Sequence, residues 1–154
     1  MVITTPERVF MLIHAERKPQ LIPTRNWLTL GLITILLTVP IVLVTQAIAV
    51  SIWPDIRLFD PLSSFPRSAL FTLVPVLAAT ALFAFLEGRV AKPAKLFMQI
   101  SIAVLVLSFI PDYLLPVANK TLLASTVAAF LHLVAGLITL TVLQLGYKEL
   151  HPAA

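Results

Sequence analysis

His132 is the residue whose chemistry stands out, because it is the single ionisable side chain in the apolar run TLLASTVAAFLHLVAGLITLTVLQL, residues 121–145. A charge inside lipid is costly, and even a neutral imidazole needs hydrogen-bond partners there. Three roles stay open: a bond that holds helices together, a proton relay or ligand contact, and ligation of a metal or pigment. No second intramembrane histidine or carboxylate shares its level, so we expect no metal and no cofactor.

Three hydroxyl side chains are the expected partners of His132. At a rise of about 1.5 Å per residue, His132 lies about 16 Å into its helix, and Thr38 and Thr80 reach a similar depth in theirs. Ser108 lies slightly outward of that level. The four residues would form one polar layer near the middle of the membrane, as a candidate ligand or proton site.

Asp112 follows Pro111 near the outer end of another apolar run. The same rise places it about 10 Å outward of His132. Either it is the outer carboxylate of a proton path or a catalytic base, or it ends a helix in a turn and pairs with Lys120. The estimated separation argues against a triad of Ser108, His132 and Asp112, so we expect no catalytic residues.

Glu87 ends an apolar run beside Arg89, Lys92 and Lys95. We expect a salt bridge at the membrane surface, with a cytoplasmic ion gate as the alternative. Three glutamines near the ends of the runs are expected to form hydrogen bonds between helices: Gln46, Gln99 and Gln144.

The amino-acid composition is that of a membrane protein. Of the 154 residues, 59% are hydrophobic and 12% charged, against about 45–50% and about 25% in soluble domains. Crossing lipid takes roughly 20 apolar helical residues. Four runs qualify, and they predict an all-α integral membrane four-helix bundle: 27–52, 68–86, 96–115 and 121–145.

The charges indicate orientation rather than nucleic-acid binding, because they are spread over the flanks of the four runs. Eight basic residues fall on one side of the predicted topology and three on the other. By the positive-inside rule, both termini are cytoplasmic and the chain is a multi-pass protein of the cytoplasmic membrane. The expected partners are the lipid bilayer, with other membrane proteins or self-association left open. The absence of cysteine excludes disulfides and thiolate chemistry.

Residues 27–147 form the predicted transmembrane domain, with a cytoplasmic segment 1–26 before it and a short tail 148–154 after it. Thr4 and Glu7 have capping-box spacing, so segment 1–26 contains a short amphipathic helix on the membrane surface or is a disordered tail. The alternative of a signal peptide cleaved near Ala47–Ala49 is disfavoured by the length of the preceding segment. The loop 53–67 is expected to lie along the outer interface or to cap the bundle.

Small and polar residues mark the helix faces that should meet one another, because hiding leucine from lipid gains nothing. Such residues recur every three or four positions in three of the runs. The three small-polar stripes are Gly31, Thr34, Thr38, Thr45 and Ala49; Ser68, Thr72, Pro75 and Ala79; and Thr121, Ser125, Ala128, His132, Ala135, Gly136 and Thr139.

Short motifs in the last two runs carry a resemblance to a known family. They are LSFIP at 107–111, and Thr121 leading to LHLVA at 131–135, with Leu86-Glu87 and Pro61-Leu62 in addition. Over residues 28–145 the chain resembles a family of uncharacterised four-span bacterial membrane proteins, domain of unknown function 6069. The resemblance implies a four-helix membrane fold and marks Ser108, Pro111, Thr121 and His132 as important.

Three functions follow in order of preference. The first is a non-enzymatic structural, accessory or interaction protein. The second is a small transporter or ligand-binding bundle with a midplane site around His132, which a cavity beside that residue would favour and tight packing would not. The third is a lipid-modifying membrane enzyme that uses His132 and Asp112 as acid and base.

Overall fold

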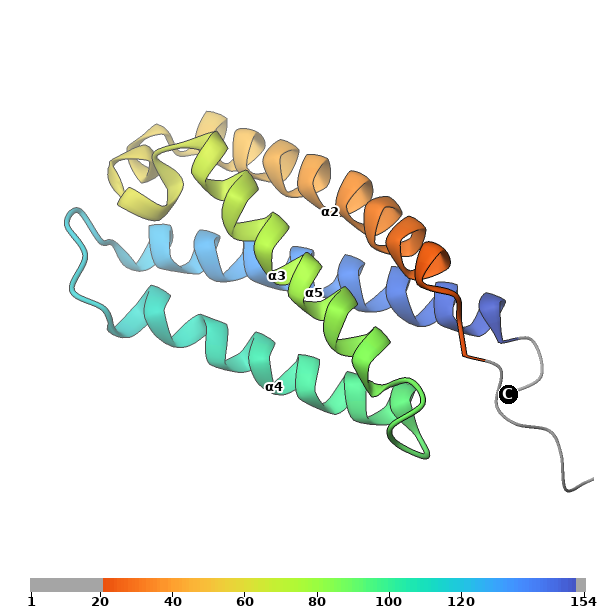
Figure 1. Cartoon of the computed structure of the whole chain (residues 1–154). Coiled ribbons are helices and arrows are strands. Elements are labelled where there is room, and N and C mark those ends of the chain that lie inside the picture. The colour runs from red at the N-terminus through yellow and green to blue at the C-terminus, as the bar shows by residue number, and fades with distance from the viewer. Residues whose placement is uncertain (1–20, 152–154) are drawn as a thin grey trace, which may run out of the picture.

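The chain folds into four long helices joined by short connections (Figure 1). A computed structural model describes residues 21–151, and within them there are no strands. All four helices are long and apolar enough to cross a membrane, which confirms the predicted bundle. The helix predicted near Thr4 lies outside the described residues. The elements are α2 (Thr24–Ile52), η1 (Pro54–Leu58), η2 (Asp60–Leu62), α3 (Phe65–Leu86), α4 (Pro93–Leu114) and α5 (Leu122–Leu150).

The helix ends follow local rules. Prolines lie in the first turns of α3 and α4, where the missing N–H costs nothing. At the start of α5, the side chain of Thr121 accepts a hydrogen bond from the Ala124 N–H at 3.1 Å. Just after α3, Gly88 has a φ of 73°, which glycine adopts without strain. Pro111 does not end α4, which continues to Leu114 and so includes Asp112.

α2 packs against both α3 and α5, whereas α4 packs mainly against α5. Figure 1 shows α3 crossing the bundle diagonally, so that it meets α4 at their shared turn and diverges from it at the other end. The beginning of α2 and the end of α5 lie at one end of the bundle, together with the α3–α4 turn. We call this the terminal end, and the opposite one, with η1 and η2, the loop end.

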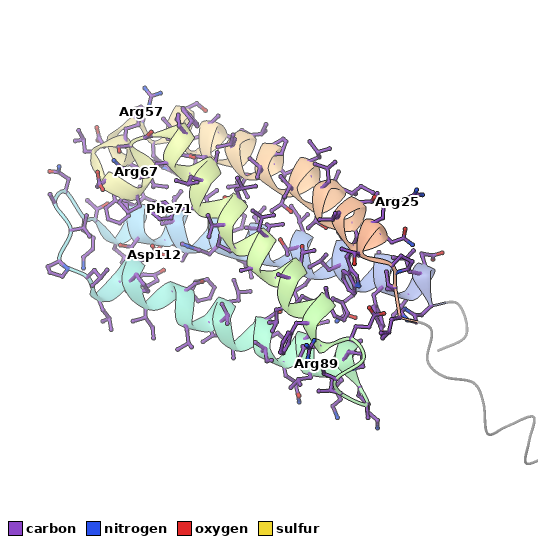
Figure 2. The ribbon with its side chains drawn as sticks, viewed as in Figure 1. Arg25, Arg57, Arg67, Phe71, Arg89 and Asp112 are labelled. Atoms are coloured by element: carbon purple, nitrogen blue, oxygen red, sulfur yellow. The ribbon has the colours of Figure 1, made fainter. Side chains whose placement is uncertain are left out.

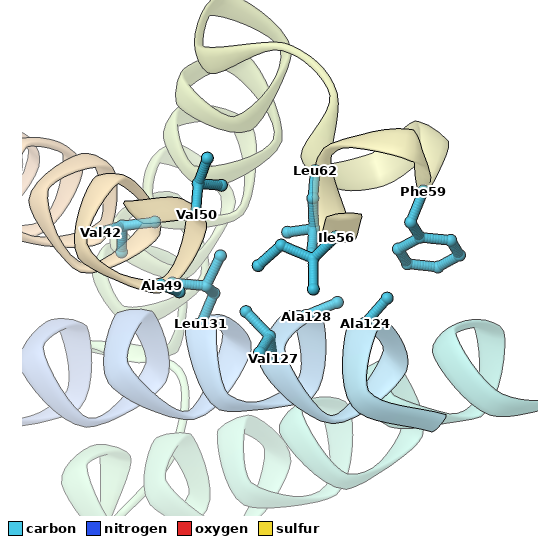
Figure 3. Close-up of a cluster of buried hydrophobic side chains, with 10 residues drawn as sticks. All are labelled: Val42, Ala49, Val50, Ile56, Phe59, Leu62, Ala124, Val127, Ala128 and Leu131. Carbon is cyan, nitrogen blue, oxygen red and sulfur yellow. The ribbon is translucent and has the colours of Figure 1, made fainter. Parts of the chain in front are cut away.

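The loop end is closed by its own connecting segment, which is one of the two placements predicted for the loop 53–67. Ile56, Phe59 and Leu62 are buried against α2 and α5 (Figure 3). The amide of Gln46 donates to the Leu62 carbonyl at 3.0 Å and so ties the segment to α2. The buried side chains and this hydrogen bond together hold the beginning of α3 against the rest of the bundle.

The terminal end is filled by aromatic rings. Phe83 of α3 stacks on Phe97 of α4 at 4.2 Å between centroids, and Tyr147 of α5 lies 4.7 Å from Phe83. The indole of Trp27 packs against Phe83 at 5.3 Å. The four helices therefore all meet at this end.

Most of the polar residues of the predicted stripes are buried. Thr34 and Thr38 are 0% exposed, and a β-carbon added to Gly31 would lie 3.0 Å from the Thr80 side chain. Gly31 thus permits a close approach of α2 and α3. Thr34 donates its hydroxyl hydrogen to the Leu30 carbonyl at 2.7 Å, within its own helix.

Candidate functional site

His132 lies on α5 with its Nδ1 atom directed at two oxygens. The Ala128 carbonyl, one turn earlier in the helix, is 3.0 Å away, and the Asp112 carboxylate oxygen Oδ2 on α4 is 3.2 Å away. The contact with Ala128 has hydrogen-bond geometry, while Asp112 Oδ2 makes no aligned hydrogen bond. The Asp112 contact is thus close and polar, and the ring hydrogen is directed mainly at the carbonyl.

None of the three predicted hydroxyl partners forms a hydrogen bond with His132, so that part of the prediction was wrong. Ser108 donates its hydroxyl hydrogen to the Leu105 carbonyl at 2.7 Å. Thr80 bonds within its own helix in the same way, at 2.9 Å. Thr38 Oγ1 is buried without a hydrogen-bond partner among the described residues.

The expectation that Asp112 is too far from His132 was also wrong. The estimate counted the backbone rise alone, but helical side chains lean toward the N-terminus of their helix. α4 and α5 run antiparallel, so Asp112 leans toward the terminal end and His132 toward the loop end. The two side chains meet although their backbones lie at different depths.

Asp112 is held against α5 as well as beside His132. Its side chain is 7% exposed, and its backbone carbonyl accepts a hydrogen bond from the Ser125 hydroxyl at 2.6 Å. Figure 2 shows Asp112 on α4 next to α5. Ser125 belongs to a predicted stripe, but the pairing with Asp112 could not be read from either segment alone.

The predicted pairing of Lys120 with Asp112 is absent from the structure. Its ammonium group donates to the carbonyls of Tyr113 and Leu115, both at 2.9 Å. The last turn of a helix leaves carbonyls without a hydrogen-bond donor. A lysine that follows the helix in the chain can reach back to them. Lys120 thus caps the end of α4.

A cavity of about 460 Å³ lies beside His132, between α3, α4 and α5. We call it the α3–α4 groove. Its walls are mainly apolar, and small side chains such as Ala79, Ala135 and Gly136 leave the space open. Its polar lining comes from Ser68, Thr72, Ser101, Ser108, His132 and Thr139.

The groove exists because α3 and α4 diverge away from their turn. Only Phe97 and Asp112 of α4 are buried, one near each end of that helix. Between them, the α4 side chains are half-buried or exposed. Phe71 of α3 marks the side of the groove nearer the loop end (Figure 2).

The side chain of Glu87 is 6% exposed and forms no salt bridge with Arg89, Lys92 or Lys95, contrary to the prediction. Its carboxylate accepts hydrogen bonds from the Ile22 N–H at 3.0 Å and from Trp27 Nε1 at 2.8 Å. His151 Nε2 lies 3.1 Å from it. The C-terminal end of α3 turns the carboxylate into the bundle, so Glu87 joins both described chain ends to α3.

The three glutamines differ. Gln144 of α5 donates to the Ala94 carbonyl of α4 at 2.9 Å and so forms the predicted bond between helices, whereas the bond of Gln46 goes to Leu62 in the loop. Gln99 lies exposed on α4.

The chemistry available at the site is limited. Within residues 21–151 no group of three histidine, cysteine, aspartate or glutamate side chains could hold a metal ion. Asp112 and His132 have the contact that an acid–base pair needs, but the Ser108 hydroxyl is bonded to its own helix and is not presented as a nucleophile. The site combines an apolar groove with one imidazole backed by a carboxylate.

The comparisons with known proteins add a family and no activity. A family model described as a family of unknown function (DUF6069) matches residues 21–147. No curated protein and no solved structure matches the chain.

Proposed function

We propose that this chain, which belongs to the family of unknown function DUF6069, binds an apolar molecule dissolved in the membrane. The binding site is the α3–α4 groove. The observation that carries the proposal is the cavity of about 460 Å³ beside His132. Ligand sites usually measure about 300–1,000 Å³ and combine apolar walls with a few polar groups. The groove has both properties, and this is why ligand binding is preferred here over a purely structural role.

The position of the groove supports entry from lipid rather than from water. It lies along the helices between α3 and α4, and η2 residues Pro61 and Leu62 border it at the loop end. A molecule dissolved in the bilayer can reach such a site sideways without crossing a polar surface.

The setting we propose is the cytoplasmic membrane, with both chain ends in the cytoplasm. The excess of basic residues flanking the terminal end supports this orientation. The lipid bilayer is then the immediate partner of the bundle and the source of its ligand.

A bulky side chain in the groove tests the proposal. Ala78 lines the groove and is exposed, so Ala78→Phe should fill the entrance without disturbing the packed helices. We expect saturable one-to-one binding of tritiated hexadecanol to the purified chain in nanodiscs, and at least about a tenfold loss of affinity in the variant.

The matched control is Ala47→Phe, on an exposed part of α2 that does not line the groove. It should bind hexadecanol as the original chain does. Unsaturable binding, or equal affinity in Ala78→Phe and the original chain, would contradict the proposal.

An accessory role is the second candidate. The exposed apolar surface of α4, where only Phe97 and Asp112 are buried, favours contact with another membrane helix. Purification in mild detergent distinguishes the two functions, because an accessory subunit should copurify with a larger membrane protein in a fixed ratio. A monodisperse single chain that binds hexadecanol supports the ligand site instead.

A further inference from the structure

The hydrogen on His132 can be assigned from its neighbours. A backbone carbonyl can only accept a hydrogen bond, and the Ala128 carbonyl lies 3.0 Å from Nδ1 with hydrogen-bond geometry. Nδ1 must therefore carry a hydrogen. The Asp112 carboxylate, 3.2 Å from the same nitrogen, favours the same assignment.

The other ring nitrogen, Nε2, is then an acceptor when the imidazole is neutral. No group within residues 21–151 forms a hydrogen bond with Nε2, although the His132 side chain is 45% exposed and lines the groove. Lipid offers no hydrogen to this nitrogen. Nε2 is therefore the ring atom that is open to a hydrogen-bond donor bound in the groove, which His132 lines.

The proposal takes the ring in its neutral form, in which Nε2 carries no hydrogen and can accept one. A charged ring in lipid is costly. Asp112 is the carboxylate that faces the ring, from α4, and its near neighbour Lys120 is engaged by two carbonyls at the end of that helix. The ring hydrogen is directed mainly at the Ala128 carbonyl, and the charge of Asp112, 3.2 Å from Nδ1, adds to the strength of Nε2 as an acceptor.

We propose that the ligand is an amphiphile with one alcohol or phenol hydroxyl on an apolar body, whose hydroxyl donates a hydrogen bond to His132 Nε2. This deepens the proposed function and rests on it. The groove holds the apolar body, and His132 selects the head. A methyl ether, which has no hydrogen to donate, and a carboxylate, which is repelled by Asp112 and also lacks a donor, should bind less well.

Three probes of equal chain length test the selection: 1-hexadecanol, hexadecyl methyl ether and palmitate. Binding to the purified chain in nanodiscs of uncharged lipid is measured by competition against tritiated hexadecanol at pH 7.5. We expect hexadecanol to bind at least about tenfold more tightly than the ether, and palmitate to compete weakly.

Variants separate recognition from structure. His132→Phe should bind hexadecanol and its ether equally, while its affinity for the ether remains near that of the original chain. Ser101→Ala removes another hydroxyl that lines the groove and should keep the original preference. Asp112→Asn should lower the preference for the alcohol, because Asp112 is a positioning residue, and should leave binding of the ether unchanged.

The possible failures have different meanings. If none of the probes binds saturably, the proposed function itself is wrong. Equal binding of alcohol and ether to the original chain overturns the hydroxyl proposal and leaves the groove as an unselective apolar site. A preference for palmitate overturns it too, because it would indicate a protonated His132.

Discussion

Glu87 illustrates how one carboxylate organises the terminal end. The Ile22 N–H, Trp27 Nε1 and His151 Nε2 lie within 3.1 Å of its two oxygens. Hydrogen bonds to a charged acceptor are shorter and stronger than neutral ones. A side chain predicted at the surface is thus a structural centre of the bundle.

Replacing Glu87 with glutamine should destabilise the chain. The substitution keeps the size of the side chain, removes its charge and places donor hydrogens against the donors that now surround it. We expect the free energy of unfolding to fall by about 1.5–3 kcal/mol, as measured by chemical unfolding in detergent. Glu149→Gln, on the exposed last turn of α5, is the control and should unfold as the original chain does. Unchanged stability in Glu87→Gln would show that these contacts contribute little.

At the scale of the helices, the small-polar stripes allow close packing more than they bond helices together. Thr72 of the α3 stripe and Thr80, which follows Ala79 of that stripe, donate to carbonyls of their own helix at 2.8 and 2.9 Å. Such bonds satisfy the hydroxyls where water is absent. The helices can then approach closely, as α2 does at Gly31, which faces Thr80 beside the α3 stripe.

Gly31→Val tests this close approach. A β-carbon at Gly31 would already lie 3.0 Å from Thr80, and the two methyl groups of valine extend further. We expect a loss of about 1–3 kcal/mol in the free energy of unfolding, as for overpacked cores. Ala47→Val, on an exposed part of α2, is the matched control. Equal stability of the two variants would mean that α2 and α3 can separate at no cost.

The helices were predictable and their polar pairings were not. Each span is a run of apolar residues as long as lipid is thick, which is a local property of the chain. The partners of Glu87, by contrast, lie 60 and 65 residues away along it. The contact of Asp112 with His132 depends on the direction in which two antiparallel helices point their side chains, and the groove depends on the angle between α3 and α4. Neither of these is encoded in the length or periodicity of a single run.

For the whole molecule, orientation is the property to test. The chain has no cysteine, so a single cysteine can be introduced at either end of the bundle. Ser63→Cys, in the exposed part of the loop, should react with an impermeant maleimide on intact cells. Glu149→Cys should react only after the membrane is permeabilised. The reverse pattern would place both chain ends outside and contradict the proposed orientation.

The sparse attachment of α4 has a mechanical consequence. α4 packs mainly against α5 along its length. An outward tilt of α4 would therefore disturb mainly its contact with α5. The aromatic stack and the turn at Gly88 would act as a pivot, while the other three helices kept their places. A large molecule in the proposed site would thus be admitted by movement of α4 rather than of another helix, and such a movement would break the contact of Asp112 with His132.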